Sequence, residues 1–301
     1  MSVRRLLPTS SALIVLLVAA CASTAPSRSP SPPVVSSATT SPSHAASPSP
    51  SPTAAALLLK VTSEGGFIGP SATLAALPAV AVYADGRIFL PGAIDAIYPA
   101  PLLQSLSVRD VGPTGAKAIA EALTRAGLDK PGGGDPGVAA DAGTTVFTVV
   151  AGGETVTTRF TGIGGGPGKP GGGNPAAAAV VDLLARLTDP AETWGAASAP
   201  ETTDVPAGFR IFVAPGGPAA DPGASQSPMA WPLATPLGAF GTPALPDRGI
   251  TGLRSGVVTG SDATALAPFL ARASVLTPIT SGGQAYTLYV RPLLPDESGG
   301  G

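Results

Sequence analysis

The chain has 301 residues, of which only 12% are charged, and glycine and proline together make up 74 of them. Three of its 17 basic residues precede Ala54 and all 19 acidic residues follow it, so the chain from Ala54 onward has a net charge near −5. Nucleic-acid binding calls for clustered lysine and arginine. No such cluster occurs in the sequence, so we do not expect nucleic acid as a partner.

Residues 1–20 have the pattern of a secretory signal. Arg4 and Arg5 give a positive start, and an apolar core of about ten residues follows from Ser11 to Ala20. A membrane-spanning helix needs about 20 apolar residues, so this stretch predicts a cleaved signal peptide rather than a permanent span. Cys21, the only cysteine, comes directly after small residues at the end of this core.

This arrangement resembles the signal of bacterial lipoproteins. In that family the cysteine sulfur receives a diacylglycerol, and cleavage makes the cysteine the new N-terminus. The resemblance implies that Cys21 is lipidated and that the mature chain is anchored to the cell membrane on its extracytoplasmic side. Each buried methylene contributes about 0.8 kcal/mol, so two acyl chains hold a protein stably. The alternative is a plain secretory signal that is cut elsewhere.

Residues 21–54 are predicted to be a tether. From Ala22 to Thr53 the sequence is almost entirely serine, proline, alanine and threonine, which cannot bury enough apolar surface to offset the entropy of ordering. Repeated proline favours an extended chain of about 3.1 Å per residue, so the tether could reach on the order of 100 Å. Its only histidine, His44, is expected to have no functional role.

The globular part begins with two predicted hairpins and two predicted helices. Asp85-Gly86 between apolar runs is typical of a hairpin turn. Pro113 and Gly127 mark the expected ends of the first helix. In chain order we predict a strand at 57–62, a hairpin at 79–83 and 87–90, a helix at 113–126, a hairpin at 145–150 and 155–160, and a helix at 175–187.

The rest of the chain predicts a strand, a helix and a strand. After a connector at 190–205, we expect a strand at 209–213, a loop at 216–226, a helix from 261 to 273 that Pro268 kinks, and a strand at 284–292. Arg291 is expected to pair with Asp296 or Glu297. This order predicts an α+β fold in which antiparallel hairpins carry helices on one face. We expect two such units, at 55–190 and 205–297, with one shared sheet as the alternative.

Three segments give a second resemblance: 83–87 (YADGR), Tyr98-Pro99 and 291–297 (RPLLPDE). With the order of hairpins and helices, they look like uncharacterised domains of secreted actinobacterial lipoproteins. The resemblance spans about two-thirds of the chain. It implies an α+β fold, and its motifs carry no known chemistry.

The globular part lacks histidine and cysteine, which excludes a Ser-His-Asp triad, a Cys-His pair and an ordinary zinc site. The glycine-rich run at 162–174 fails the phosphate-loop pattern because Pro170 replaces the required serine or threonine. We therefore predict no catalytic residue, metal or cofactor. Asp129, Asp135 and Asp141 could form a calcium site or an acid/base pair, although a solvated loop is the preferred interpretation.

The candidate binding residues are aromatic. Trp231, Tyr83 and Tyr98 could line a groove for a sugar or a peptide, and burial in the core is the preferred alternative for such scarce aromatics in an alanine-rich chain.

Our leading hypothesis is therefore a lipid-anchored envelope domain that binds or scaffolds a cell-wall glycan or an envelope protein. Two alternatives stay open: a carboxylate-dependent hydrolase of cell-wall glycan, and a solute-binding subunit of a transporter. The transporter subunit would need a cleft between two doubly wound lobes, which the hairpin pattern disfavours. The sequence does not predict the oligomeric state.

Overall fold

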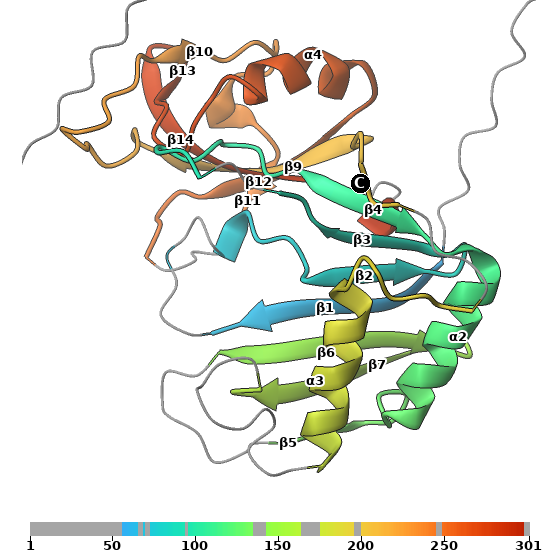
Figure 1. Cartoon of the computed structure of the whole chain (residues 1–301). Helices are drawn as coiled ribbons and strands as arrows, with labels where there is room; N and C mark the ends of the chain where they lie inside the picture. The colour runs from blue at the N-terminus through green and yellow to red at the C-terminus, as the bar shows by residue number, and fades with distance from the viewer. Residues whose placement is uncertain are drawn as a thin grey trace, which may run out of the picture. The chain divides into compact units, whose positions relative to one another are not determined.

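Two β-sheets and the helices packed on them form the framework of the computed structural model (Figure 1). The structure describes residues 56–297 except 66–68, 70–72, 94–95, 135–142, 164–174, 196–199 and 245–248. Within these residues there are three α-helices, and the strands are mostly antiparallel. The predicted α+β fold class is confirmed.

The first sheet is built from β1 (Leu57–Glu64), β2 (Val80–Tyr83), β3 (Arg87–Pro91), β4 (Leu106–Asp110), β5 (Gly132–Gly134), β6 (Thr144–Ala151), β7 (Glu154–Thr161) and β8 (Thr202–Thr203). Its strand order is β5-β7-β6-β1-β2-β3-β4-β8. The two helices of this part are α2 (Gly112–Arg125) and α3 (Pro175–Thr188). Both predicted hairpins and both predicted helices are present within one or two residues of their expected bounds.

The second sheet contains β9 (Gly208–Pro215), β10 (Met229–Ala230), β11 (Thr242–Pro243), β12 (Arg254–Thr259), β13 (Ile279–Ser281) and β14 (Gln284–Pro292). Its order is β10-β13-β14-β9-β12-β11. The helix α4 (Gly260–Leu270) follows β12, and two short 3₁₀ turns are η2 (Leu237–Ala239) and η3 (Pro295–Glu297).

Helices α2 and α3 cover one face of the first sheet (Figure 1). Successive side chains of a strand point to opposite faces, so alternate residues of β2 and β3 reach the helices. Val80, Val82, Ile88 and Leu90 pack in one buried cluster with Ile119 and Val180 of the helices. The predicted packing of helices on one face is therefore confirmed.

The opposite face of β2 and β3 is also covered. Tyr83 and Phe89 point away from the helices and pack with Leu106 and Leu294 in a second buried cluster. Leu294 lies beyond β14, so the end of the chain returns to the first sheet. As a result every residue of β2 is buried, which explains why its sequence is continuously apolar rather than alternating.

The second sheet packs against α4 through one face of β9 and β14. Tyr286, Leu288 and Val290 share this face, as the sequence predicted, and lie in one cluster with Leu266 and Leu270. The predicted helix end at residue 273 is wrong, because α4 ends at Leu270. Pro268 lies in its last turn, where proline removes a backbone donor, and the helix ends two residues later.

A segment of the loop between β3 and β4 joins the second half of the chain. The amide of Leu102 donates to the carbonyl of Ala273 at 2.9 Å, and the amide of Val275 donates to that of Ala100 at 3.0 Å. The side chain of Leu102 is buried in the cluster around α4. Leu102 therefore packs with the second sheet, just as Leu294 packs with the first. The domain boundaries at 190 and 205 stay a prediction.

Two strands of five or more residues, β4 and β12, were not predicted. β4 has the sequence LSVRD and β12 has RSGVVT, and both mix polar residues or glycine with few apolar ones. The predicted connector at 190–205 contains β8, a strand of two residues at the sheet edge. None of the described helices is long and apolar enough to cross a membrane.

Candidate functional site

Two of the three predicted binding aromatics are buried. The side chain of Trp231 is 9% exposed and lies edge-on to Phe240 and Phe269, with ring centroids 6.1 and 5.9 Å away. Its indole Nε1 donates to the carbonyl of Thr235 at 2.9 Å. The ring of Trp231 therefore packs in the core of the second sheet, and its Nε1 has a hydrogen-bond acceptor within the protein.

Tyr83 lies in the core between the first sheet and the end of the chain. Its ring meets Phe89 edge-on at 5.4 Å, and its hydroxyl donates to Asp296 Oδ1 at 2.5 Å. Burial and the neighbouring Asp296 carboxylate raise the pKa of Tyr83 far above its usual range. The phenol therefore stays neutral and acts as a hydrogen-bond donor to Asp296.

Tyr98 is the exposed member of the three, with 71% of its surface accessible. It belongs to the loop between β3 and β4, and its hydroxyl donates to Oδ2 of Asp221 in the loop after β9. The other oxygen of Asp221 accepts the amide of Gly223 at 2.9 Å. Two loops that are far apart in sequence thus meet at one carboxylate.

Asp221 lines a cavity of about 280 Å³. The walls are mainly proline, alanine and leucine, and the polar groups are few. Among the lining residues are Pro218, Asp221, Pro222, Gln226, Leu276 and Pro278. We call this space the Asp221 cavity. An apolar wall with a few placed polar groups is the usual composition of a small-molecule site.

The electrostatics of the Asp221 cavity favour a negative charge. The hydroxyl of Tyr98 and the amide of Gly223 hold the pKa of Asp221 below its usual range. The same hydrogen bond raises the pKa of Tyr98. At neutral pH the site therefore presents an ionised carboxylate beside a neutral, exposed phenol ring, which suits recognition of a ligand better than proton donation to one.

A second, shallower cavity of about 340 Å³ lies next to the first. It is lined by Met229, Ala230, Phe269 and Arg272. The amide of Met229 donates to the carbonyl of Pro278, which lines the Asp221 cavity, so the two spaces share a wall. Asp221 lines the first of these cavities and Arg272 lines the second.

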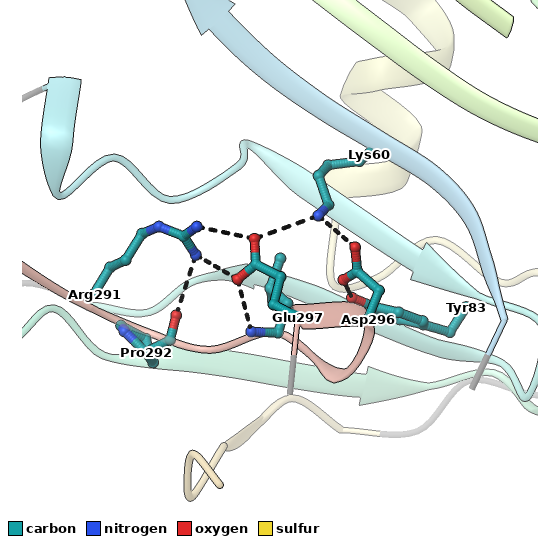
Figure 2. A network of polar contacts seen from close by, with 7 residues as sticks. Lys60, Tyr83, Arg291, Pro292, Asp296 and Glu297 are labelled. Carbon is teal, nitrogen blue, oxygen red and sulfur yellow. Dashed lines mark hydrogen bonds and ion pairs between the residues drawn. The ribbon is translucent and has the colours of Figure 1, made fainter. Parts of the chain in front are cut away.

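A second polar cluster, the C-terminal ion network (Figure 2), consists of Lys60, Tyr83, Arg291, Asp296 and Glu297. Lys60 Nζ lies 2.6 Å from Asp296 Oδ2 and 3.6 Å from Glu297 Oε1. Arg291 donates to both oxygens of Glu297 at 2.6 and 2.9 Å. The predicted pairing of Arg291 near the chain end is confirmed, with Glu297 as its partner.

This network joins β1 and β2 to the turn η3, and its charges balance. Burial opposes ionisation of Glu297, but Arg291 and Lys60 outweigh it and hold the pKa of Glu297 below its usual range. A carboxyl that acts as a general acid needs a raised pKa. The adjacent carboxylates of Asp296 and Glu297 therefore serve as a structural clasp rather than an acid/base pair.

Replacing Glu297 by glutamine is expected to lower the free energy of unfolding by about 1–3 kcal/mol at pH 7, because two charge-assisted hydrogen bonds are lost. The folded pKa of Glu297 is depressed, so its contribution is complete above the unfolded value of about 4.3 and disappears as the pH falls through the folded value. Urea denaturation between pH 7 and pH 3 should show the difference from wild type shrinking with acid.

Glu64 provides a matched control, because its pair with Arg159 is long, at 3.5 Å, and more than half exposed. Glu64→Gln should change stability by about 0–1 kcal/mol. A Glu297→Gln effect no larger than this, or one that does not depend on pH, would contradict the role of the network as a clasp.

The other sequence candidates are not assembled into a site by the described residues. Asp135 and Asp141 lie outside them, and one oxygen of Asp129 is buried with no hydrogen-bond partner in the part that is described. Within that part no group of three acidic, histidine or cysteine residues could hold a metal ion. Lipidation of Cys21 also falls outside the described residues and stays a prediction.

The residues of the cavity and the ion network that sequence reasoning missed are Asp221 and Lys60. Asp221 lies in the predicted loop at 216–226, but nothing local indicates that it meets Tyr98, which is 123 positions away. Comparison of the chain with protein-family models, with curated proteins and with solved structures gives no match.

Proposed function

We propose that this chain is a lipid-anchored extracytoplasmic domain that binds another component of the cell envelope. The observation that carries the proposal is the Asp221 cavity with Tyr98 beside it. Tyr98 was a candidate from residue type alone, and it is both exposed and hydrogen-bonded to a carboxylate that lines a cavity.

The N-terminal sequence supports the location. The signal pattern ending at Cys21 favours a lipid anchor, and the proline-rich tether after it would allow the folded part to act on the order of 100 Å from the membrane. A binding surface on a long tether suits a partner that is fixed in the envelope at a distance from the bilayer.

The chemistry of the described carboxylates favours binding over hydrolysis. A glycosidase needs two facing carboxyl groups, one of them with a raised pKa. Asp296 and Glu297 are adjacent but are paired with cations and with Tyr83. Burial raises the pKa of Asp204, yet no second carboxylate contacts it among the contacts of the described residues. Asp221 is ionised and held by two donors.

The test is co-sedimentation of the purified full chain with lipid-free cell-wall material, so that the lipid anchor does not contribute. We expect the wild-type chain to sediment with the wall, and Tyr98→Ala to reduce the bound fraction several-fold, because the exposed ring beside the Asp221 cavity is removed. The matched control is Val205→Ala, which trims a side chain that is 89% exposed and does not line the cavity.

Equal losses for Tyr98→Ala and Val205→Ala, or no sedimentation of the wild-type chain, would contradict binding through this surface. The anchor is tested separately in cells. Cys21→Ser should abolish incorporation of a labelled fatty acid and release the chain from the membrane fraction. A chain that is secreted and unlabelled even with Cys21 in place would support the plain secretory signal instead.

A further inference from the structure

Asp221 is a carboxylate without a basic partner in the described part of the chain. The ion pairs found there, with N···O distances of 4.0 Å or less, all involve other acids. The groups that hold Asp221 are a neutral phenol and a backbone amide. These donors fix the carboxylate in place without neutralising it, so its charge is available to a ligand.

The arrangement of the donors limits which cation fits. Oδ1 already accepts the amide of Gly223, and Oδ2 already accepts the hydroxyl of Tyr98. A guanidinium pairs best with a carboxylate when both oxygens are free to accept two parallel bonds. Each oxygen of Asp221 keeps one acceptor position after the bonds from Gly223 and Tyr98. An ammonium is a compact point charge that needs one such position, whereas a guanidinium needs both positions side by side, so an ammonium is the less demanding partner.

The surroundings supply the rest of the site. The cavity wall beside Asp221 includes Pro218, Leu276 and Pro278, which suits a short aliphatic chain. Its volume of about 280 Å³ lies just below the usual range for small-molecule sites, about 300–1,000 Å³, which suits a small ligand. The exposed ring of Tyr98 is held next to the Asp221 carboxylate by its hydroxyl, and aromatic rings attract cations that come within about 6 Å of their faces. The net charge of about −5 from Ala54 onward adds a weak attraction of the same sign.

We propose that the Asp221 cavity binds a primary ammonium group on a short aliphatic chain, with Asp221 as the counter-charge, the Tyr98 ring beside the cation and the apolar wall around the chain. This inference rests on the proposed binding function and gives that function a ligand class. The same chemistry occurs in a lysine-type side chain of a peptide and in a free diamine.

The experiment is calorimetric titration of the purified full chain with Nα-acetyl-lysine amide, with 1,5-diaminopentane and with Nα-acetyl-norleucine amide, which replaces the ammonium by hydrogen. We expect the two amines to bind at least about tenfold more tightly than the norleucine derivative, because a charge-assisted hydrogen bond is worth that factor or more. Binding should weaken as salt is added. Tighter binding of the lysine derivative identifies a peptide as the source, and tighter binding of the diamine identifies a free amine.

Variants locate the binding. Asp221→Asn keeps the shape of the side chain and removes its charge, and it should weaken amine binding about tenfold. Tyr98→Phe keeps the ring but removes the hydrogen bond that positions Asp221, so a smaller loss is expected. Glu154→Gln is the control, because it removes an exposed negative charge from β7 that does not line the cavity, and it should leave amine binding unchanged.

Several results would overturn the inference: equal binding of the norleucine derivative, tighter binding of Nα-acetyl-arginine amide, or equal losses for Asp221→Asn and Glu154→Gln. Absence of amine binding in a chain that still sediments with cell-wall material would overturn the ligand class and leave the proposed function intact. Absence of sedimentation together with amine binding would overturn the proposed partner and keep the ammonium site.

Discussion

Replacement of Gly86 by alanine is expected to lower the free energy of unfolding by about 2–5 kcal/mol. Gly86 has φ +99°, in the left-handed region that disfavours other residues. An added Cβ would also lie 2.4 Å from the backbone N, C and O atoms of Gly112. Those atoms begin α2, and the carbonyl of Gly86 accepts the amide of Val111 at 3.0 Å, so neither side can move independently.

Gly152 is the matched control, since it lies in the turn of the second hairpin. Its φ is +60°, and a Cβ there would meet no atom within 4 Å. Gly152→Ala should therefore show only the backbone penalty of about 1–2 kcal/mol. Urea denaturation of both variants measures the difference, which is the energy of the clash with Gly112. Equal losses for the two variants would contradict a close contact between this turn and α2.

The hairpin at Gly86 illustrates what local sequence determines in this fold. Asp85-Gly86-Arg87 predicted the turn correctly, and the structure adds that both carboxylate oxygens of Asp85 hold Arg87, by its amide at 3.1 Å and its guanidinium at 2.8 Å. Turns and amphipathic helices depend on residues a few positions apart, so their signals lie within one window of sequence. The contact of Gly86 with the start of α2 is not within such a window.

The strands that were missed depend on tertiary contacts. β12 contains Gly256, which weakens a strand signal. In the structure a Cβ at Gly256 would lie 2.7 Å from the ring of Phe240, so glycine is present because a phenylalanine covers it. The position of that ring is set by its packing on Trp231. A strand whose composition is dictated by a distant ring cannot be recognised from composition alone.

The sequence predicted which residue types could form a binding site, but it did not predict which of those residues are exposed. Residue type selected Tyr83, Tyr98 and Trp231 together, because scarce aromatics fill cores and also line binding surfaces. Burial separates them, and burial is decided by the elements that pack over each ring: the end of the chain over Tyr83, and α4 over Trp231. The partner of Tyr98 comes from the segment 216–226, which the sequence predicted only as a loop.

Replacement of Arg109 by methionine is expected to lower the free energy of unfolding by about 2–4 kcal/mol. Arg109 is fully buried on β4, opposite Ile88, and so faces the helices. Its guanidinium donates to the carbonyls of Leu187, at 3.3 Å, and of Asp189. These are backbone acceptors at the C-terminal end of α3, where helices leave carbonyl groups unpaired and favour positive charge.

Methionine replaces the aliphatic stem of arginine and lacks the guanidinium, so the loss reports the missing donors together with the space that the guanidinium leaves. Arg109→Lys keeps the charge, but one ammonium cannot donate to both carbonyls as the guanidinium does, and an intermediate loss is expected.

Arg125→Met is the control, because it removes an exposed arginine from the last turn of α2 and should change stability by at most about 1 kcal/mol. If urea denaturation gives Arg109→Met the same stability as Arg125→Met, the buried guanidinium does not hold the end of α3. A larger loss at Arg109 means that a charged residue in a strand, which the sequence pattern assigns to solvent, instead joins the first sheet to its helix.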